Sequence, residues 1–161
     1  MSGLSEANVW LLTDGKAGHA NQCLGLAAAL GVDAEAKSLM PRFPWSRLPP
    51  QLWFNPLRAG DPDGTQLIPP WPDMVIAAGR QTVAPALAIK SASGGRAFCV
   101  QIQDPGVSPT AFDLVVAPAH DRLDGDNVIS TIGAMQGVDP DALAAAKASF
   151  AARVERLPRP L

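Results

Sequence analysis

Hydrophobic residues in this chain gather in short continuous runs, which are typical of buried β-strands. These runs predict strands within residues 9–13, 32–39, 73–80, 96–105, 112–121 and 126–134. Most of the runs are apolar throughout and do not alternate with polar residues. Strands of that kind are buried on both faces, which is typical of a parallel sheet covered by helices.

Helical spacing occurs between several of these runs. Residues 20–30 carry apolar side chains at the spacing of one helix face, namely Cys23, Leu26, Ala27 and Leu30. Gly31 follows as a stop signal. A second helix is predicted over residues 82–93, with Thr82 as its cap and Pro85 in its first turn.

A third helix is predicted after Asp139, with Pro140 in its first turn. Its apolar face would hold Leu143, Ala146, Phe150, Val154 and Leu157. Strands that alternate with helices indicate an α/β domain with a doubly wound, mostly parallel, Rossmann-like sheet. The closing "RLPRPL" resembles a linker, so we expect one domain over 1–157 and a linker to a further, C-terminal domain at 158–161.

Residues 41–72 interrupt the alternation. They hold nine of the sixteen prolines, which excludes a long helix or a central strand and leaves room for one short helix near 51–58. Large aromatic residues lie between these prolines: Phe43, Trp45, Trp53, Phe54 and Trp71. With Arg42, Arg47 and Arg58 nearby, they suit a peripheral membrane contact or an apolar acceptor, and the alternative is a loop folded onto its own aromatic side chains.

Composition narrows the classes of protein. The 161 residues are 47% hydrophobic with a net charge of −2, so we expect one domain with a core and no nucleic-acid partner. Cys23 and Cys99 have no metal-ligand spacing and are expected to be free thiols. The first eight residues lack the features of a signal peptide, and no apolar run approaches the roughly 20 residues of a membrane span. A cytoplasmic protein is expected.

Polar residues follow the predicted strands, at the edge where ligands bind in open α/β sheets. Those singled out are Asp14, Lys16, His19, Gly79, Arg80, Gln103, Asp104, His120 and Asp121. They predict a ligand crevice with no metal. Arg80 begins a helix, where a cation needs a nearby anion, either a ligand or Asp104.

The turn after the first strand matches no standard phosphate loop. Gly15 and Gly18 flank Lys16, whereas a P-loop places lysine after its second glycine, and a dinucleotide loop needs a third glycine. A tight turn at a helix N-terminus still favours an anion or sugar oxygens. The helix dipole disfavours a cationic His19, and a neutral imidazole can deprotonate a hydroxyl; Asp14 is the alternative base.

Four stretches, "LTDGKAGHANQCLGLAAALG", "PPWPDMVIAAGR", "VQIQDP" and "FDLVVAPAHD", closely resemble the bacterial branch of the Elm-type mitochondrial fission family. Members of that family resemble GT-B glycosyltransferases, and this chain is similar to their N-terminal, acceptor-side domain. The first turn is also similar to the glycine-rich loop of the peptidoglycan N-acetylglucosaminyltransferase. That likeness implies that Gly15, Gly18 and His19 lie at the cleft, although Asp14 and Lys16 replace the usual glycine or threonine.

The resemblance leaves two functions open. One is a glycosyltransferase half without a resident cofactor, which uses a nucleotide-diphosphate sugar as donor and a lipid or glycan as acceptor. Such a half would be inactive alone and could lie at the inner face of a membrane. The other is a non-enzymatic adaptor that keeps the GT-B shape. The epimerase label carried by bacterial members fails because the chain has no tyrosine for a Tyr-x-x-x-Lys pair. A lone flavodoxin-like binding domain is a third, weaker reading.

Overall fold

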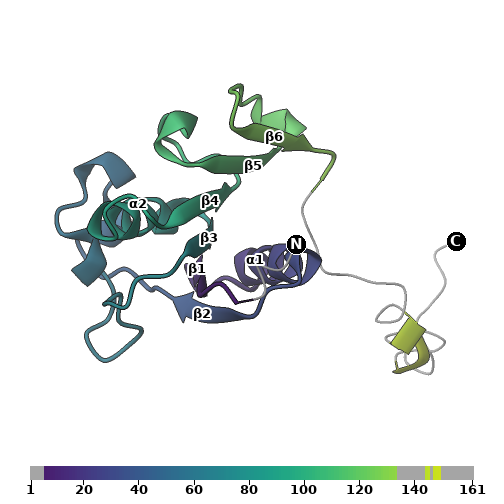
Figure 1. Cartoon of the computed structure of the whole chain (residues 1–161), viewed down its shortest axis with the longest axis horizontal. Coiled ribbons are helices and arrows are strands. Elements are labelled where there is room, and N and C mark those ends of the chain that lie inside the picture. The colour runs from purple at the N-terminus through teal and green to yellow at the C-terminus, as the bar shows by residue number, and fades with distance from the viewer. Residues whose placement is uncertain (1–5, 134–143, 146, 150–161) are drawn as a thin grey trace, which may run out of the picture.

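A parallel β-sheet forms the centre of the molecule (Figure 1). The computed structural model describes residues 6–133, 144, 145 and 147–149. Within them, six parallel strands have the order β2-β1-β3-β4-β5-β6. The strands are β1 (Val9–Thr13), β2 (Ala34–Ser38), β3 (Met74–Ala78), β4 (Phe98–Ile102), β5 (Leu114–Pro118) and β6 (Val128–Thr131). Each lies inside one of the predicted runs.

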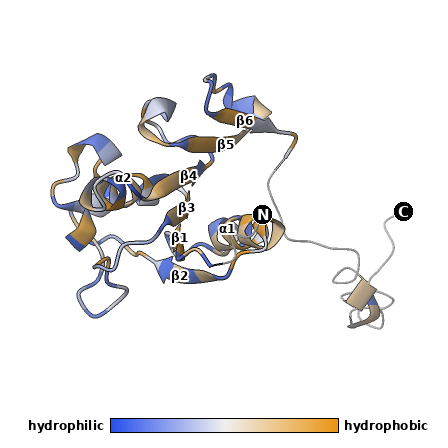
Figure 2. Ribbon diagram, in the orientation of Figure 1, coloured by the Kyte–Doolittle hydropathy of each residue, from blue (hydrophilic) through white to orange (hydrophobic). Residues whose placement is uncertain are grey.

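Helices α1 (Ala17–Leu30) and α2 (Val83–Ala92) cover opposite faces of the sheet. Helix α1 connects β1 to β2, and α2 connects β3 to β4 (Figure 1). The pleat of β1 sends Leu11 into the core under α1 and Leu12 into the core under α2. Figure 2 shows β3 and β5 as largely hydrophobic ribbon, with hydrophilic residues on the edge strand β2. The doubly wound α/β prediction is therefore confirmed.

Helix α1 ends at Leu30 with Gly31 as its stop, as predicted, but its start and the burial of Leu30 differ from the prediction. It begins at Ala17, three residues early, so that His19 lies in its first turn. Leu30 is 38% exposed, although its spacing predicts burial. The chain turns at Gly31 with φ of +66°, and the next residue, Val32, enters the core there.

Thr82 is the N-cap residue of α2, as predicted, but its side chain makes no capping hydrogen bond. Its hydroxyl donates to the Gly79 carbonyl at 2.7 Å, which closes the turn between β3 and α2. Of the predicted third helix, residues 144, 145 and 147–149 are described and are helical. The residues given for its apolar face and the linker expected at 158–161 lie outside the described residues.

The proline-rich segment 41–72 takes the place of a crossover helix between β2 and β3. The single helix expected there is wrong. Three single 3-10 turns form instead, because prolines start two of them and cannot donate the hydrogen bonds that would extend a helix. The 3-10 turns of the described chain are η1 (Trp45–Arg47), η2 (Pro50–Leu52), η3 (Pro56–Arg58), η4 (Arg80–Thr82), η5 (Pro109–Ala111) and η6 (Ala119–Asp121).

Segment 41–72 folds onto its own aromatic side chains. The Trp45 indole donates to the Phe54 carbonyl at 2.7 Å, and its ring lies 4.9 Å from the Phe54 ring, between centroids. Trp53 donates to the Leu48 carbonyl at 3.0 Å and packs against Ala84 of α2. The segment is thereby held on the outer side of α2.

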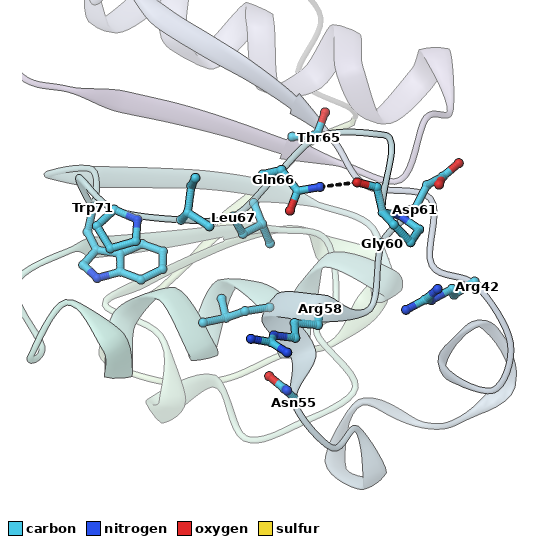
Figure 3. A pocket seen from close by; sticks show the side chains of 13 residues that line it. Arg42, Asn55, Arg58, Gly60, Asp61, Thr65, Gln66, Leu67 and Trp71 are labelled. Atoms are coloured by element: carbon cyan, nitrogen blue, oxygen red, sulfur yellow. Dashed lines mark hydrogen bonds between the residues drawn. The ribbon is translucent and has the colours of Figure 1, made fainter.

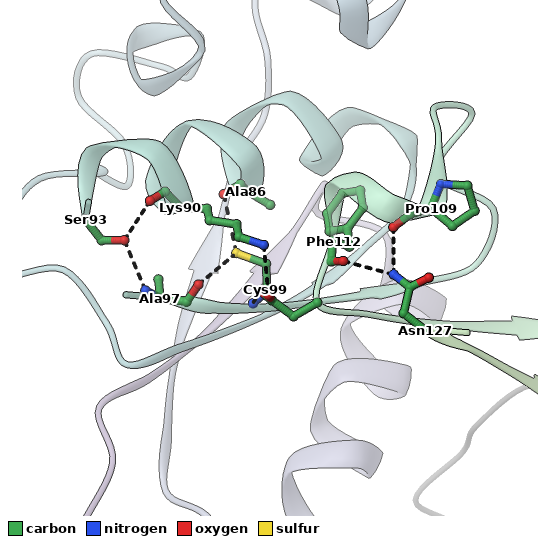
Figure 4. Close-up of polar contacts among 9 residues, drawn as sticks. Ala86, Lys90, Ser93, Ala97, Cys99, Pro109, Phe112 and Asn127 are labelled. Atoms are coloured by element: carbon green, nitrogen blue, oxygen red, sulfur yellow. Dashed lines mark hydrogen bonds and ion pairs between the residues drawn. The ribbon is translucent and has the colours of Figure 1, made fainter. Parts of the chain in front are cut away.

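Side-chain hydrogen bonds hold the last two strands, whose connections contain only η5 and η6. The Asn127 amide donates to the carbonyls of Pro109 and Phe112 at 2.8 and 2.9 Å (Figure 4). Asp113 accepts from the Cys99 backbone N–H at 2.8 Å and pairs with Lys90 of α2 at 2.9 Å. These contacts join β5 and β6 to the rest of the sheet where no helix does so.

Both cysteines are free thiols in the core, as the sequence predicts. The Cys99 thiol lies against the carbonyls of Ala86 and Ala97 (Figure 4). Burial raises the pKa of Cys23 and that of Cys99 to about 12. The thiols are therefore protonated and unreactive at neutral pH.

The packing of Trp53 generates a test of how the 41–72 segment is held. Trp53→Ala should lower the free energy of unfolding by about 3 kcal/mol, because Trp53 is only 8% exposed and its removal leaves a cavity in the packing. The neighbouring Phe54→Ala should cost less than about 1 kcal/mol, because Phe54 is 59% exposed. Urea unfolding measures both; equal losses would contradict the packing.

Candidate functional site

The candidate site lies where the chain leaves β1 and β3. From β1 the chain enters α1 on one face of the sheet, and from β3 it enters α2 on the opposite face. Neighbouring loops that part in this way leave a crevice at the carboxyl edge, the usual ligand position in open α/β sheets. Asp14 follows β1 at this point, and Gly79 follows β3.

Asp14 and His19 form a hydrogen-bonded pair at the centre of the site. The distance from His19 Nδ1 to Asp14 Oδ1 is 2.7 Å, and the Asp14 side chain is 1% exposed. Lys16 adds its ammonium group at 3.3 Å from Asp14 Oδ2 and its backbone N–H at 3.4 Å from Oδ1. A buried carboxylate is thus supplied with donors from the turn and from the first turn of α1.

The electrostatics of the pair keep Asp14 ionised. Burial alone would raise the pKa of Asp14, but the hydrogen bond and charge of His19, with the hydrogen bonds from Lys16, outweigh burial and lower that pKa below its ordinary value. The ionised carboxylate accepts a hydrogen bond from the Nδ1–H group of His19. In a neutral imidazole this leaves Nε2 as the unprotonated nitrogen.

This geometry separates the roles that the sequence left open between two side chains. His19 is 17% exposed in its side chain, whereas Asp14 lies behind it. An imidazole oriented by a buried carboxylate is the arrangement of a general base with its orienting acid. The structure therefore favours His19 as the group that contacts a ligand, with Asp14 holding it in position.

Gly79 makes room for the pair. A Cβ at this position would lie 2.5 Å from His19 Nδ1 and 3.2 Å from Asp14 Oδ2, and the residue has φ of +93°. Only glycine meets both demands without strain. Gly15 also has a positive φ, of +80°, whereas nothing lies within 4 Å of a Cβ added at Gly18.

A cavity of about 220 Å³ lies beside the carboxylate, between the turn and segment 41–72. Three cations contribute to its lining: Lys16, Arg47 and Arg80. Within the described chain, neither Arg47 nor Arg80 has a carboxylate within ion-pair distance. His19 is not among the residues that line the cavity, but it contacts Asp14, which does line it, at 2.7 Å. The site thus has a cationic cavity and an imidazole that both meet one carboxylate.

The sequence does not predict the other polar residues of this cavity. It indicates Arg47 only as a neighbour of aromatic residues, and it gives no signal for Ser46 or Gln81. Gln81 donates to the Ser46 carbonyl at 3.4 Å, which ties segment 41–72 to η4. Only the fold of the 41–72 segment brings Arg47 to the edge of the sheet.

The remaining predicted residues lie elsewhere along the edge. Asp104 does not pair with Arg80, because its carboxylate accepts from the Gly106 N–H at 2.8 Å in a local turn. Gln103 has φ of +72°, and its side-chain amide donates to Gln22 on the face of the sheet that α1 covers.

The side chain of His120 is 81% exposed, and its Nε2 lies 3.4 Å from the carboxylate of Asp121. It follows β5, two strands away from β3 in the sheet. The structure therefore groups the residues of the first turn with Gly79 and Arg80, and it leaves Gln103, Asp104, His120 and Asp121 apart.

Two further searches bear on the site. The described residues contain no cluster of three or more histidine, cysteine, aspartate or glutamate side chains placed to hold a metal ion. Among the helices of the described part of the chain, none is both long enough and apolar enough to cross a membrane.

Comparison with known proteins gives one family. The family model described as "Mitochondrial fission ELM1" matches residues 17–161. The chain is 30% identical over 113 residues to "Mitochondrial fission protein ELM1" of Arabidopsis thaliana, which covers 56% of this chain and 26% of that protein. It is 31% identical over 121 residues to "Uncharacterized protein RP120" of Rickettsia prowazekii (strain Madrid E), and this match covers 73% of this chain and 33% of that protein. The chain thus spans about a third or less of these relatives. No solved structure matches significantly.

The hydrogen bond from His19 to Asp14 predicts one tautomer. Nitrogen-correlated NMR above the titration range of histidine should show His19 as the Nδ1–H form. In Asp14→Asn the fixed acceptor is lost, and the tautomer should become mixed or reversed. His120, the other histidine, is a reference in the same spectrum and should not change. A His19 ring that is Nε2–H in the wild type would contradict the pairing.

The two glycines of the site predict opposite effects of the same substitution. Gly79→Ala should lower the free energy of unfolding by about 1–3 kcal/mol, because φ is positive and the methyl group would meet the His19 ring. Gly18→Ala, in open space within α1, should raise it by up to about 1 kcal/mol. Thermal or urea unfolding compares them, and a Gly79→Ala variant as stable as Gly18→Ala would refute the close contact.

Proposed function

The chain belongs to the mitochondrial fission ELM1 family, and on that premise we propose that it forms the acceptor-side half of a GT-B-like glycosyltransferase. The donor would be a nucleotide-diphosphate sugar, held mainly by a second domain. One observation carries this proposal: a carboxylate-oriented imidazole and a cationic cavity meet at Asp14, where the segments that follow β1 and β3 part to opposite faces of the sheet. That combination suits the transfer of a group to a hydroxyl near a phosphate.

In the proposed reaction His19 is the general base. Its Nε2 takes the proton of the acceptor hydroxyl as that oxygen bonds to the anomeric carbon of the sugar. The bond from that carbon to the donor diphosphate breaks, and the diphosphate leaves with the electron pair. Asp14 stabilises the imidazolium that forms, as a buried carboxylate does in a hydrolase triad.

The cations of the cavity have a separate role in this proposal. Lys16, Arg47 and Arg80 would hold an anionic group, which we assign to a phosphate carried by the acceptor because this half faces the acceptor. Arginine is suited to that task since its planar guanidinium can donate two parallel hydrogen bonds to a phosphate. A phosphate there would also supply the anion that Arg80 lacks at the start of η4.

The acceptor in this proposal is a lipid or glycan, reached by peripheral contact with a membrane. Four large apolar side chains of segment 41–72 remain exposed: Phe43 at 77%, Leu52 at 63%, Phe54 at 59% and Ile68 at 59%. Lys37, Arg42, Arg47 and Arg58 are the only charged residues between 36 and 60. Apolar and cationic groups on one segment are suited to an anionic lipid surface.

A second candidate function is a non-enzymatic adaptor. It is favoured by the name of the Arabidopsis relative, which describes a fission protein and no transferase. In that role the same surface would recruit another protein, and the Asp14–His19 pair would be structural. Nucleotide-sugar binding distinguishes the two functions, because the adaptor requires none.

The proposed role of His19 predicts a specific loss of activity. In the full-length protein, His19→Gln should lower turnover of UDP- or GDP-sugars by about 100-fold or more, the contribution of a general base. The matched His120→Gln should leave turnover unchanged, because His120 follows β5 and lies apart from the Asp14–His19 pair. Calorimetry accompanies the assay. Turnover that is unchanged in His19→Gln would remove His19 from the mechanism, and no heat with any sugar nucleotide would favour the adaptor.

A further inference from the structure

A second and larger cavity lies within segment 41–72 and shares no residue with the candidate site. Its volume is about 510 Å³, inside the range of roughly 300–1,000 Å³ that is usual for small-molecule sites. Figure 3 shows it between η3 and the loop that leads to β3. The proposed transferase reaction does not use it.

One wall of this cavity is apolar. Leu57, Leu67 and Trp71 line it and pack on the core under α2. The Trp71 ring meets Trp10 of β1 edge-on, with 6.2 Å between ring centroids. The wall is therefore anchored on the sheet and does not depend on the ligand for its position.

A glycine supports this part of the cavity. A Cβ added at Gly60 would lie 2.6 Å from Cδ1 of Leu39, which is itself buried. The backbone of segment 41–72 can approach the core this closely only because residue 60 has no side chain. The cavity is thus lined by backbone fixed against the core.

The opposite wall carries charge that nothing in the described chain neutralises. Arg58 and Asn55 line it next to each other, and neither side chain has a hydrogen-bond or ion-pair partner among the described residues (Figure 3). Arg42 lines the cavity as a second cation and lies over the Trp45 ring, 5.7 Å from its centroid. Asp61, the acidic residue of the lining, lies beside Gln66 and apart from Arg58.

We propose that this cavity is a second ligand site, which takes a small amphiphilic anion. Arg58 and Asn55 would bind its phosphate or carboxylate, and its apolar body would lie against Leu57, Leu67 and Trp71. A guanidinium next to a carboxamide offers several donors to one anion, and the facing apolar wall removes hydrocarbon from water. A soluble phosphorylated molecule and a lipid with its headgroup share this chemistry.

Indole N–H signals in NMR spectra of the ¹⁵N-labelled chain test the site directly. The probe is dihexanoyl phosphatidic acid, a phosphate on two short acyl chains, kept below its micelle concentration. The Trp71 signal should shift and saturate, and its response gives the affinity. Trp53 lines the cationic cavity of the candidate site and reports binding there separately. A Trp71 signal that does not move would overturn the proposal.

Variants distinguish this cavity from other surfaces. Arg58→Met should weaken the Trp71 titration about tenfold, the lower end for a hydrogen bond to a charged group. The matched Arg122→Met, outside the cavity, should leave it unchanged. Thr65→Trp places a large side chain in the cavity and should abolish the shift of the Trp71 signal, even though Arg58 is unchanged in this variant. Equal affinities for the two arginine variants, or wild-type binding by Thr65→Trp, would refute the site.

Two further probes separate the sources of the anion. Inorganic phosphate should shift Trp71 at least tenfold more weakly than the short-chain lipid, and equal affinity would refute the apolar half of the proposal. Vesicles of phosphatidic acid and phosphatidylcholine test the membrane. If vesicles bind the chain while the monomeric lipid does not shift the Trp71 signal, the chain binds anionic lipid at its surface and not in the cavity. That result would overturn the proposal. None of these measurements depends on turnover. Their outcome is therefore independent of the proposed role of His19 in catalysis.

Discussion

The hydrogen bond between Asp14 and His19 is the constraint around which the site is arranged. A carboxylate that is almost fully buried must be paired, because an isolated charge away from water is strongly destabilising. His19 and Lys16 provide this pairing only if α1 begins early enough to bring the imidazole back over the end of β1. The early start of α1 at Ala17 is thus part of the same arrangement as the carboxylate.

The pair also sets conditions on the neighbouring strand. Its imidazole occupies the space that a side chain after β3 would need, so residue 79 has no Cβ. The positive φ at Gly79 then turns the chain toward α2, where Thr82 bonds back to the Gly79 carbonyl. Two loops that leave the sheet on opposite faces are therefore joined at one point, and a ligand bound there would contact both.

The absence of an α-helix between β2 and β3 of the described chain shapes the rest of the surface. Prolines break this crossover into single turns, so its packing relies on a few aromatic side chains and not on a continuous apolar stripe. Trp53 anchors it on α2, and Leu67 and Trp71 anchor it on the sheet. Short turns held at separate points leave space between them, which accounts for one cavity within the segment and another between the segment and the candidate site. The same turns carry Arg47 toward one cavity and Arg58 toward the other.

Much of the fold could be predicted because it depends on local patterns. Apolar runs such as 9–13 and 73–80 form strands wherever a core is available, and a stop at Gly31 needs only its own backbone freedom. The strand-end rule also placed Asp14, His19, Gly79 and Arg80 at one edge correctly. By contrast, Leu30 has the spacing that predicts burial, yet Val32 occupies the core at that end of α1. Which of the two residues is buried depends on tertiary packing and not on spacing along the chain.

What the sequence determined by itself is therefore the α/β class, the order of the elements and the edge at which polar residues gather, since these follow from periodicity and from the direction of parallel strands. The tertiary structure alone decided which of those residues meet. Strand order separates His120 from the pair by two strands, a local turn occupies Asp104, and the folding of a proline-rich crossover brings Arg47 beside Lys16. Such contacts depend on distances across the sheet, which no spacing along the chain encodes.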